Sequence, residues 1–183
     1  DYKMLSIFRN PIDVSHSWWV RGWGSRIGKD PRAFTITIKY NDEAMPWYCK
    51  GVEREWQHLN SYERCVMMAM NLIERAVQQY KKTLGKNRIH IFAFEDFIQK
   101  TDEELKKICD FVGTNTTIYT PQTLLQAKCP NVIDIENRKR KLAEFEANVK
   151  KDLFDKLIML SESHEKDIYG LRQIQDSVNK GFG

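Results

Sequence analysis

The stretch MLSIFRNPIDVSHSWW, residues 4–19, decides the fold. Its apolar start, residues 4–8, predicts a short buried β-strand. Arg9 comes directly after this strand, and Ser17 follows eight residues later in a segment with helical features. A strand, a cationic side chain and a helix therefore follow one another without an intervening loop.

The second half of the stretch has the features of a helix start. Asn10 suits the N-cap, Pro11 suits the first helical position, and Asp13 stands where its side chain can reach back to the cap. We expect this helix to run to about Val20 and to end among the glycines of residues 22–24.

A second helix and a second strand follow in the order of a crossover unit. Residues 63–82 carry apolar side chains at spacings of three and four, which predicts an amphipathic helix, and Gly85 is a stop signal. RIHIFAF, residues 88–94, predicts another apolar strand. A strand, a helix and a strand in this order favour parallel pairing, so the predicted fold class is α/β with a central parallel sheet flanked by helices.

Further helices are predicted downstream. Thr101 and Glu104 have the spacing of a capping box at the start of a helix over 101–112, and Gly113 should end that helix. Helical patterning returns over 137–163.

The segment between the first two helices is less regular. Residues 22–51 are rich in glycine, proline and tryptophan, which is typical of irregular structure. Within it, AFTITIKY alternates like a strand, although a loop with β-branched residues has the same appearance.

Composition argues against several classes of protein. The 183 residues include 29 basic and 25 acidic ones, and the net charge of +4 is far from the extremes of nucleic-acid-binding proteins. No apolar run approaches the roughly 20 residues that cross a bilayer, and no secretory signal is visible. The four cysteines lack zinc-like spacing, which favours buried free thiols.

Arg9 and Ser17 are the candidate binding residues. The carboxyl end of a parallel strand next to a helix N-terminus favours an anion, and a guanidinium offers planar donors that match a phosphate. Ser17 would add a neutral hydrogen bond. The residues alone leave an alternative open, in which Arg9 pairs with a carboxylate and Ser17 is an ordinary helix serine.

The opening stretch resembles a segment of sulfotransferases. FRNPIDVSHSW is similar to the segment that binds the 3′-phosphate of the donor 3′-phosphoadenosine 5′-phosphosulfate (PAPS), which that family writes Arg-Asp-Pro-Arg-Asp-Val with a serine eight residues after the first arginine. The matching residues are Arg9, Pro11, Asp13, Val14 and Ser17, whereas Asn10 and Ile12 depart from the pattern.

Two later segments extend the resemblance. IFAFEDFIQKTDEELKKICDFVG, residues 91–113, is similar to the family's Tyr-Glu-Asp-Leu stretch and the helix after it, and DIYGL, residues 167–171, resembles the closing segment of bacterial and carbohydrate-type members. In the first of these, Glu95 and Asp96 are expected to hold neighbouring loops and not to act in catalysis.

The resemblance implies a P-loop-NTPase-like sulfotransferase fold in one domain over residues 1–183. The family's Pro-Lys-x-Gly-Thr-Thr loop, which wraps the 5′-phosphosulfate, is absent from these residues, and its catalytic base usually precedes the 3′-phosphate segment. We therefore expect that an N-terminal portion of the domain is missing. The catalytic residue cannot be assigned within these 183 residues. Arg138, in the basic cluster 138–141, is a further candidate for contact with the nucleotide.

The implied reaction moves a sulfuryl group from PAPS to a hydroxyl or amine on a small molecule or glycan. No metal, nucleic acid or membrane segment is implied, and the compartment would be the cytoplasm for a bacterial member or the Golgi lumen for a eukaryotic carbohydrate-type member. Tryptophans suit a sugar or phenol acceptor, although core packing explains them as well. His16 is interpreted as a polar packing residue.

Two other functions stay open. The chain could bind a 3′-phosphonucleotide or a protein partner without catalysis. It could also bind nucleic acid through residues 138–151, although Glu144 and Glu146 interrupt the basic surface there.

Overall fold

The computed structural model describes residues 2–30, 35–83 and 88–181. The chain divides into two compact units, which we describe separately. The first unit comprises residues 1–10, 79–135 and 163–183, and the second comprises residues 11–78 and 136–162. The mixed α/β class is confirmed, and whether the whole chain is one domain stays a prediction.

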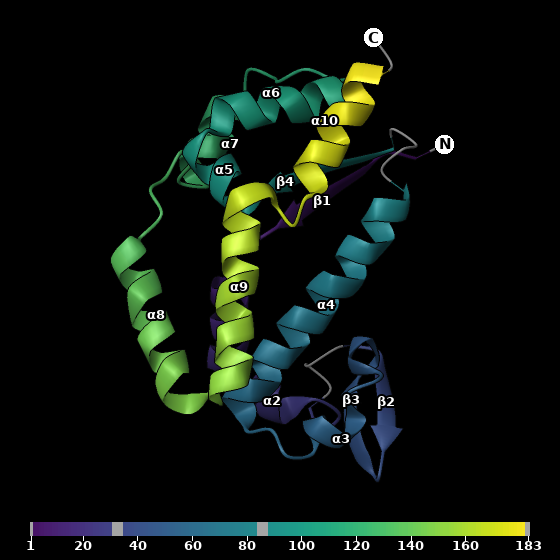
Figure 1. Ribbon diagram of the computed structural model, residues 1–183. Coiled ribbons are helices and arrows are strands. Elements are labelled where there is room, and N and C mark those ends of the chain that lie inside the picture. Colours follow the sequence, from purple (N-terminus) through teal and green to yellow (C-terminus); the bar gives the residue numbers. More distant parts are fainter. Residues whose placement is uncertain (1, 31–34, 84–87, 182–183) are drawn as a thin grey trace. The chain divides into compact units, whose positions relative to one another are not determined.

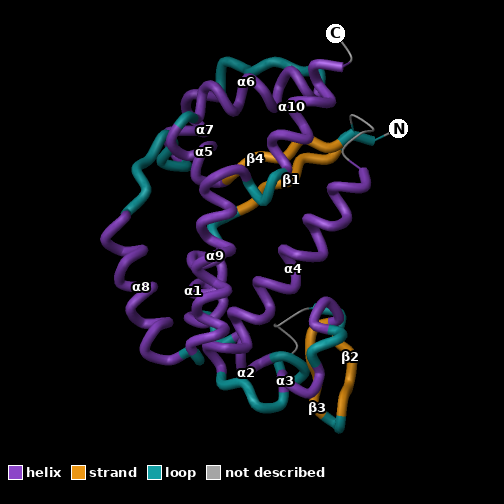
Figure 2. Tube along the Cα trace, viewed as in Figure 1, coloured by secondary structure: helices purple, strands orange, loops and turns teal. Residues whose placement is uncertain are grey.

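The first unit is built on two parallel strands. Strand β1 (Met4–Phe8) pairs with β4 (Ile89–Ala93) in a register that places Phe8 opposite Ala93. The two strands run side by side in Figure 2. The parallel pairing predicted from the strand–helix–strand order is therefore confirmed. Their carboxyl ends meet at one edge, where β1 continues into Arg9 and β4 into the next helix.

Helices cover β4, whose five residues are all buried. They are α5 (Phe94–Gln99), α6 (Thr101–Val112) and α10 (Leu171–Gly181), and α7 (Thr120–Gln126) completes the unit (Figure 1). Strand β1 is different, because Leu5 and Ile7 are 44% and 54% exposed. The prediction that β1 is buried is wrong for these two side chains. They lie on the face of the strand opposite to Phe8, which is buried, and no described element covers them.

A side chain occupies the free edge of β4. The Ile91 N–H donates to Gln175 Oε1 at 2.8 Å, and Gln175 Nε2 donates to the Ile91 carbonyl at 3.4 Å. The amide of Gln175, on α10, thus satisfies the backbone groups that a neighbouring strand would otherwise take.

The second unit is mainly helical. It holds α1 (Pro11–Val20), α2 (Trp23–Arg26), α3 (Glu53–Trp56), a 3-10 helix (Trp47–Cys49), α8 (Ile135–Asn148) and the hairpin β2 (Thr37–Tyr40) and β3 (Glu43–Pro46). Helices α4 (Ser61–Thr83) and α9 (Lys151–Asp167) pass from one unit into the other. In the part of the chain that the structure describes, no helix has the length and apolarity needed to cross a membrane.

The predicted strand AFTITIKY is confirmed over Thr37–Tyr40, and its first residues lie partly outside the described ones. Its partner β3 was not predicted. The turn between them uses Asn41 and Asp42 with φ of 47° and 62°, the left-handed conformation that a tight two-residue hairpin needs and that Asn and Asp tolerate.

The predicted helix over 137–163 is two helices, α8 and α9. The Lys150 N–H, at the start of α9, donates to Glu63 Oε1 at 3.1 Å, and Asn60 Nδ2 donates to the Asn148 carbonyl at 2.9 Å. Side chains from the start of α4 therefore satisfy backbone groups at the break, which apolar spacing within 137–163 cannot reveal.

The predicted capping box at Thr101 is wrong. The Thr101 hydroxyl donates to the Phe97 carbonyl at 2.8 Å, and Glu104 pairs with Lys107 at 2.5 Å. Because α5 ends directly before α6, the chain ahead of Thr101 is already helical and offers a carbonyl one turn back.

Gly24, on α2, lies against the start of α4. A Cβ added at this position would stand 2.0 Å from the Ser61 carbonyl oxygen, which belongs to the backbone and cannot rotate away. We predict that Gly24→Ala lowers the free energy of unfolding by about 1–3 kcal/mol, the usual cost of overpacking, in a urea titration. Lys29→Ala, at an exposed site nearby, should change it by no more than about 0.5 kcal/mol. Equal stability of the two variants would contradict this close approach.

Candidate functional site

Arg9 lies at the carboxyl end of β1 and is exposed. Its guanidinium carbon stands 4.8 Å from the centre of the Phe94 ring, at the carboxyl end of β4. No carboxylate among the described residues pairs with Arg9. The alternative in which this arginine is held in an ion pair therefore finds no support, and its planar donors stay available to an anion.

Hydrogen bonds fix Asn10, the residue after Arg9. The Asn10 side chain is fully buried, and the Asn10 N–H donates to Glu95 Oε1 at 2.9 Å. The other carboxylate oxygen, Oε2, lies 3.0 Å from His164 Nε2. Glu95 thus joins the ends of β1 and α9, in agreement with the expectation that it has a structural role.

Asp96, its neighbour, forms an ion pair with Arg172 of α10. This contact also holds neighbouring elements together.

Ser17 lies in the second unit, on α1, and is partly buried. Arg9 belongs to the first unit. Two residues before Ser17, Ser15 is fully buried and its hydroxyl has no partner among the described residues. The shared phosphate contact predicted for Arg9 and Ser17 stays a prediction.

Arg138, the third candidate, forms an ion pair within the second unit. Arg138 Nη2 stands 2.8 Å from Asp13 Oδ2, and Lys141 Nζ stands 2.5 Å from Asp13 Oδ1. The expectation that Asp13 reaches back to the helix cap did not anticipate these two cations on α8. Burial alone would raise the pKa of Asp13, but the hydrogen bonds from Lys141 and Arg138 outweigh it and leave the pKa below its usual value.

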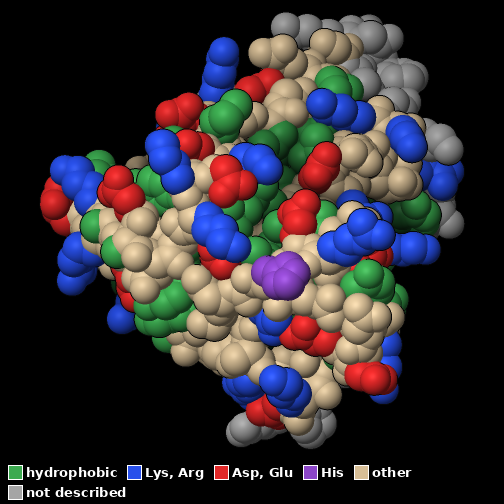
Figure 3. Space-filling view, turned by 60° about the horizontal axis from the view of Figure 1, so that its bottom comes forward, with side chains coloured by type: hydrophobic (Ala, Val, Ile, Leu, Met, Phe, Trp, Pro, Cys, Tyr) green, Lys and Arg blue, Asp and Glu red, His purple; other side chains and the backbone are tan. Residues whose placement is uncertain are grey.

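The rest of the basic cluster is also engaged. Lys139 pairs with Glu136 at 2.7 Å, and Arg140 Nη2 lies 3.5 Å from Asn137 Oδ1. On the face that Figure 3 shows, basic and acidic side chains are interspersed. The contacts of the cluster with Asp13, Glu136 and Asn137 lend no support to a nucleic-acid surface on α8, because such a surface needs cations that are free to meet phosphates.

His16 has a packing role, as expected. Its Nε2 lies 3.1 Å from Glu144 Oε2, and Tyr62 donates its hydroxyl to Glu144 Oε1 at 3.0 Å. The ring of His16 contacts Trp19 and Phe145.

The tryptophans divide between packing and exposure. Trp56 is buried, Trp18 stacks on Trp23 with ring centres 5.4 Å apart, and Trp19 stacks on Tyr62 at 4.2 Å. Trp47 is 44% exposed. Core or lateral packing therefore accounts for most of them. Trp47 is the most exposed of the five, and the guanidinium carbon of Arg75 stands 5.9 Å from the centre of its ring.

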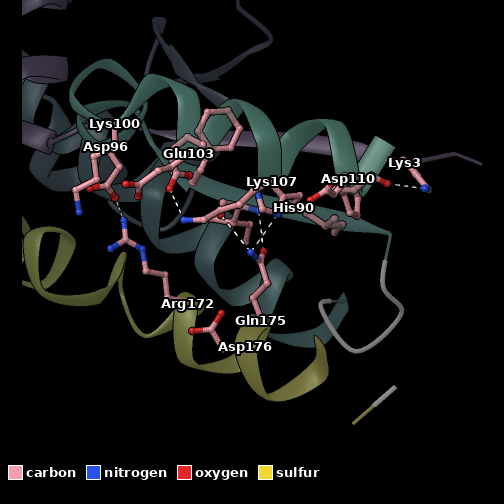
Figure 4. Close-up of a pocket in the computed structure, with 15 residues that line it drawn as sticks. Lys3, His90, Asp96, Lys100, Glu103, Lys107, Asp110, Arg172, Gln175 and Asp176 are labelled. Atoms are coloured by element: carbon pink, nitrogen blue, oxygen red, sulfur yellow. Dashed lines mark hydrogen bonds and ion pairs between the residues drawn. The ribbon is translucent and has the colours of Figure 1, made fainter. Parts of the chain in front are cut away.

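A cavity of about 680 Å³ lies in the first unit along β4, between α6 and α10 (Figure 4). Charged side chains of both signs line it, and several are already paired, as Arg172 is with Asp96. Its floor includes His90, whose pKa burial lowers. None of Arg9, Ser17 and Arg138 lines this cavity, so it is separate from the predicted site residues.

Among the described residues, no three His, Cys, Asp or Glu side chains form a group that could hold a metal ion. Cys49, Cys65 and Cys109 are buried free thiols, as the sequence predicts, and Cys129 is partly exposed. Burial raises the pKa of the Cys49 and Cys65 thiols to about 12, which keeps them protonated and unreactive.

These observations define a mixed α/β protein with an unpaired cationic side chain at the carboxyl end of a parallel strand. Residues 1–146 match the family model of the sulfotransferase domain, and the chain therefore belongs to the sulfotransferase family. The resemblance seen in the sequence is confirmed at this level, and a transferase of sulfuryl groups is the general activity that it indicates. No curated protein and no solved structure matches the chain significantly.

Sequence reasoning missed His164 and Tyr169 at the end of β1. His164 is 3% exposed and lies 3.0 Å from Glu95, and the Tyr169 ring packs on Phe8 with centres 5.7 Å apart. Tyr169 could have been singled out because it belongs to the DIYGL motif, but no sequence pattern indicates that this motif contacts β1.

Asp13→Asn should destabilise the protein by about 1–3 kcal/mol at pH 7, because it removes the charge that Arg138 and Lys141 share. The pKa of Asp13 is lower in the folded state than the usual 3.8, so its contribution is present above that value and is lost as the pH falls through the folded-state pKa. The stability difference from the wild type should therefore shrink in acid, as measured by denaturation at several pH values.

Glu146→Gln is the control, since it removes an exposed carboxylate from α8, the helix that carries Arg138 and Lys141. A difference between Asp13→Asn and the wild type that does not depend on pH would refute the assignment of this stability to the Asp13 charge.

Proposed function

We propose that this protein transfers a sulfuryl group from PAPS to an acceptor hydroxyl or amine, and that Arg9 and Ser17 bind the 3′-phosphate of the donor. The observation that carries this proposal is the exposed Arg9 guanidinium, which no described carboxylate neutralises, at the carboxyl end of β1. Membership in the sulfotransferase family supplies the type of reaction.

The position of Arg9 suits an anchoring role. Ligands of α/β proteins bind outside the carboxyl ends of parallel strands, and α1 begins two residues after Arg9, so its first N–H groups add a partial positive charge near the same point of the chain. The Phe94 ring supports the arginine from one side without using its hydrogen-bond donors. These features fit the phosphate on a ribose.

Arg9 and Ser17 would act by binding and not by chemistry. Sulfuryl transfer resembles phosphoryl transfer in that positioning and charge stabilisation lower most of the barrier. Binding the 3′-phosphate, at the end of the donor remote from the sulfuryl group, fixes the alignment of the donor with the acceptor. The binding energy can thereby lower the barrier to transfer. Neither residue is assigned a contact with the transferred group.

A carbohydrate acceptor is the finer part of the proposal. Trp47, 44% exposed, offers an aromatic face of the kind on which sugar rings stack. The carbohydrate class rests on this ring and on the resemblance of DIYGL to carbohydrate-type members. Arg138 stays a secondary candidate, since its guanidinium already contacts Asp13.

Arg9→Ala should weaken binding of 3′-phosphoadenosine 5′-phosphate, the desulfated product, by about 1.5–3 kcal/mol in isothermal titration calorimetry. The expected loss is that of hydrogen bonds to a charged group. Ser17→Ala, which removes a neutral donor, should cost about 0.5–1.5 kcal/mol.

The matched control is a ligand without the 3′-phosphate. Binding of 5′-AMP should be the same for the wild type and for Arg9→Ala, because the group that Arg9 contacts is missing from this ligand. Unchanged affinity of Arg9→Ala for the bisphosphate would refute the assignment. A protein that binds the bisphosphate but shows no transfer of labelled sulfate to any acceptor would instead be a binding module.

A further inference from the structure

A partly buried hydrogen-bond network surrounds the end of β1. Glu95 stands at its centre and accepts from the Asn10 N–H at 2.9 Å and from His164 Nε2 at 3.0 Å. Asn10 Nδ2 also donates to Glu165 Oε1 at 3.1 Å. The three segments that meet here are the residue after β1, the start of α5 and the end of α9, and all belong to the first unit.

The protonation of this network follows from its geometry. The side chains of His164 and Glu95 are 2% and 13% exposed, so an unpaired charge would be unfavourable at either position. Burial alone would raise the pKa of Glu95, but the hydrogen bonds from His164 and Asn10 outweigh it and leave the pKa below its usual value. Because an ionised carboxylate can only accept, His164 Nε2 must carry a proton.

The DIYGL motif holds His164 from the other side. Ile168, Tyr169 and Gly170 have φ of 43°, 64° and 78°, so three consecutive residues adopt the left-handed conformation and reverse the chain after α9. Two of them are not glycine, and such a conformation persists only where the surroundings fix it. Here the Tyr169 ring lies 5.5 Å from the ring of His164 and 5.7 Å from that of Phe8.

Arg9 therefore stands between two fixed neighbours. Phe8, on one side, packs against Tyr169, and Asn10, on the other, is held by Glu95. Its guanidinium rests on Phe94, the residue that precedes Glu95. The backbone of Arg9 is thus constrained on both sides, while its side chain stays exposed.

We propose that Glu95 and His164 are positioning residues, which hold Asn10 and so aim Arg9 at the 3′-phosphate of the donor. This inference rests on the proposed function and deepens it. An exposed arginine samples many rotamers and loses conformational entropy when it binds a phosphate. A fixed backbone and an aromatic ring on one side of the guanidinium reduce this loss. The same contacts explain the DIYGL motif, since its reverse turn brings Tyr169 against both His164 and Phe8.

The test compares ligand affinities of variants of the full-length protein. Glu95→Gln keeps the shape of the side chain but leaves one acceptor oxygen for two donors. We expect its affinity for 3′-phosphoadenosine 5′-phosphate to fall about tenfold, the equivalent of one hydrogen bond, with the affinity for 5′-AMP unchanged. His164→Leu should show the same loss, and His164→Gln, whose amide N–H can replace the Nε2 donor, should restore affinity to within about twofold of the wild type.

Two controls separate positioning from a general effect on folding. Tyr169→Phe removes a buried hydroxyl that has no partner among the described residues and keeps the ring, so affinity should not change. Thermal unfolding of each variant verifies that it is folded. Should Glu95→Gln fail to fold, the comparison of His164→Gln with His164→Leu decides the question.

A double-mutant cycle with Arg9→Ala completes the test. If Glu95 acts through Arg9, then Glu95→Gln should cause no further loss of bisphosphate affinity in the Arg9→Ala protein. An equal loss in both backgrounds, or a parallel loss of 5′-AMP affinity, overturns the positioning role. Lower affinity of Arg9→Ala with normal affinity of Glu95→Gln overturns this inference alone, whereas normal affinity of Arg9→Ala overturns the proposed function together with it.

Discussion

The parallel pairing of β1 with β4 is the constraint on which the site depends. Parallel strands end at the same edge, so the register that sets Phe8 opposite Ala93 also brings Arg9 near Phe94 and Asn10 near Glu95. An antiparallel pairing of the same sequences would place these residues at opposite ends. The contacts between two segments some 85 residues apart are thus a consequence of strand direction.

Local patterns predicted the elements that depend on local physics. The strand at Met4–Phe8, the helix from Pro11 to Val20 and the helix ended by Gly113 lie where the sequence places them, because caps, stop signals and apolar periodicity act within a few residues. The capping box predicted at Thr101 is wrong for a related reason. A helix ends directly before Thr101, so the Thr101 hydroxyl donates to a carbonyl of that helix and caps no backbone N–H. The break at Val149 escaped prediction because Glu63, distant in sequence, supplies the acceptor that stabilises it.

The candidate site shows the same division. Arg9 was identified from its place after a strand, and its free guanidinium agrees with that interpretation. His164 could not be identified, since a histidine near the end of a helix has no distinctive local pattern and its partner Glu95 lies 69 positions earlier. Asp13 was assigned a local contact, whereas the structure gives it two cations from α8. Charged side chains that pair across long sequence separations are what a single sequence conceals.

The Gln175 amide at the edge of β4 has a consequence for solubility. An open strand edge is a template on which another chain can add a strand, and β4 is a hazardous one because all five of its residues are buried and four of them are apolar. An incoming strand would have to break both bonds between Gln175 and Ile91 before it could pair there. One glutamine thus protects the first unit against edge-to-edge aggregation.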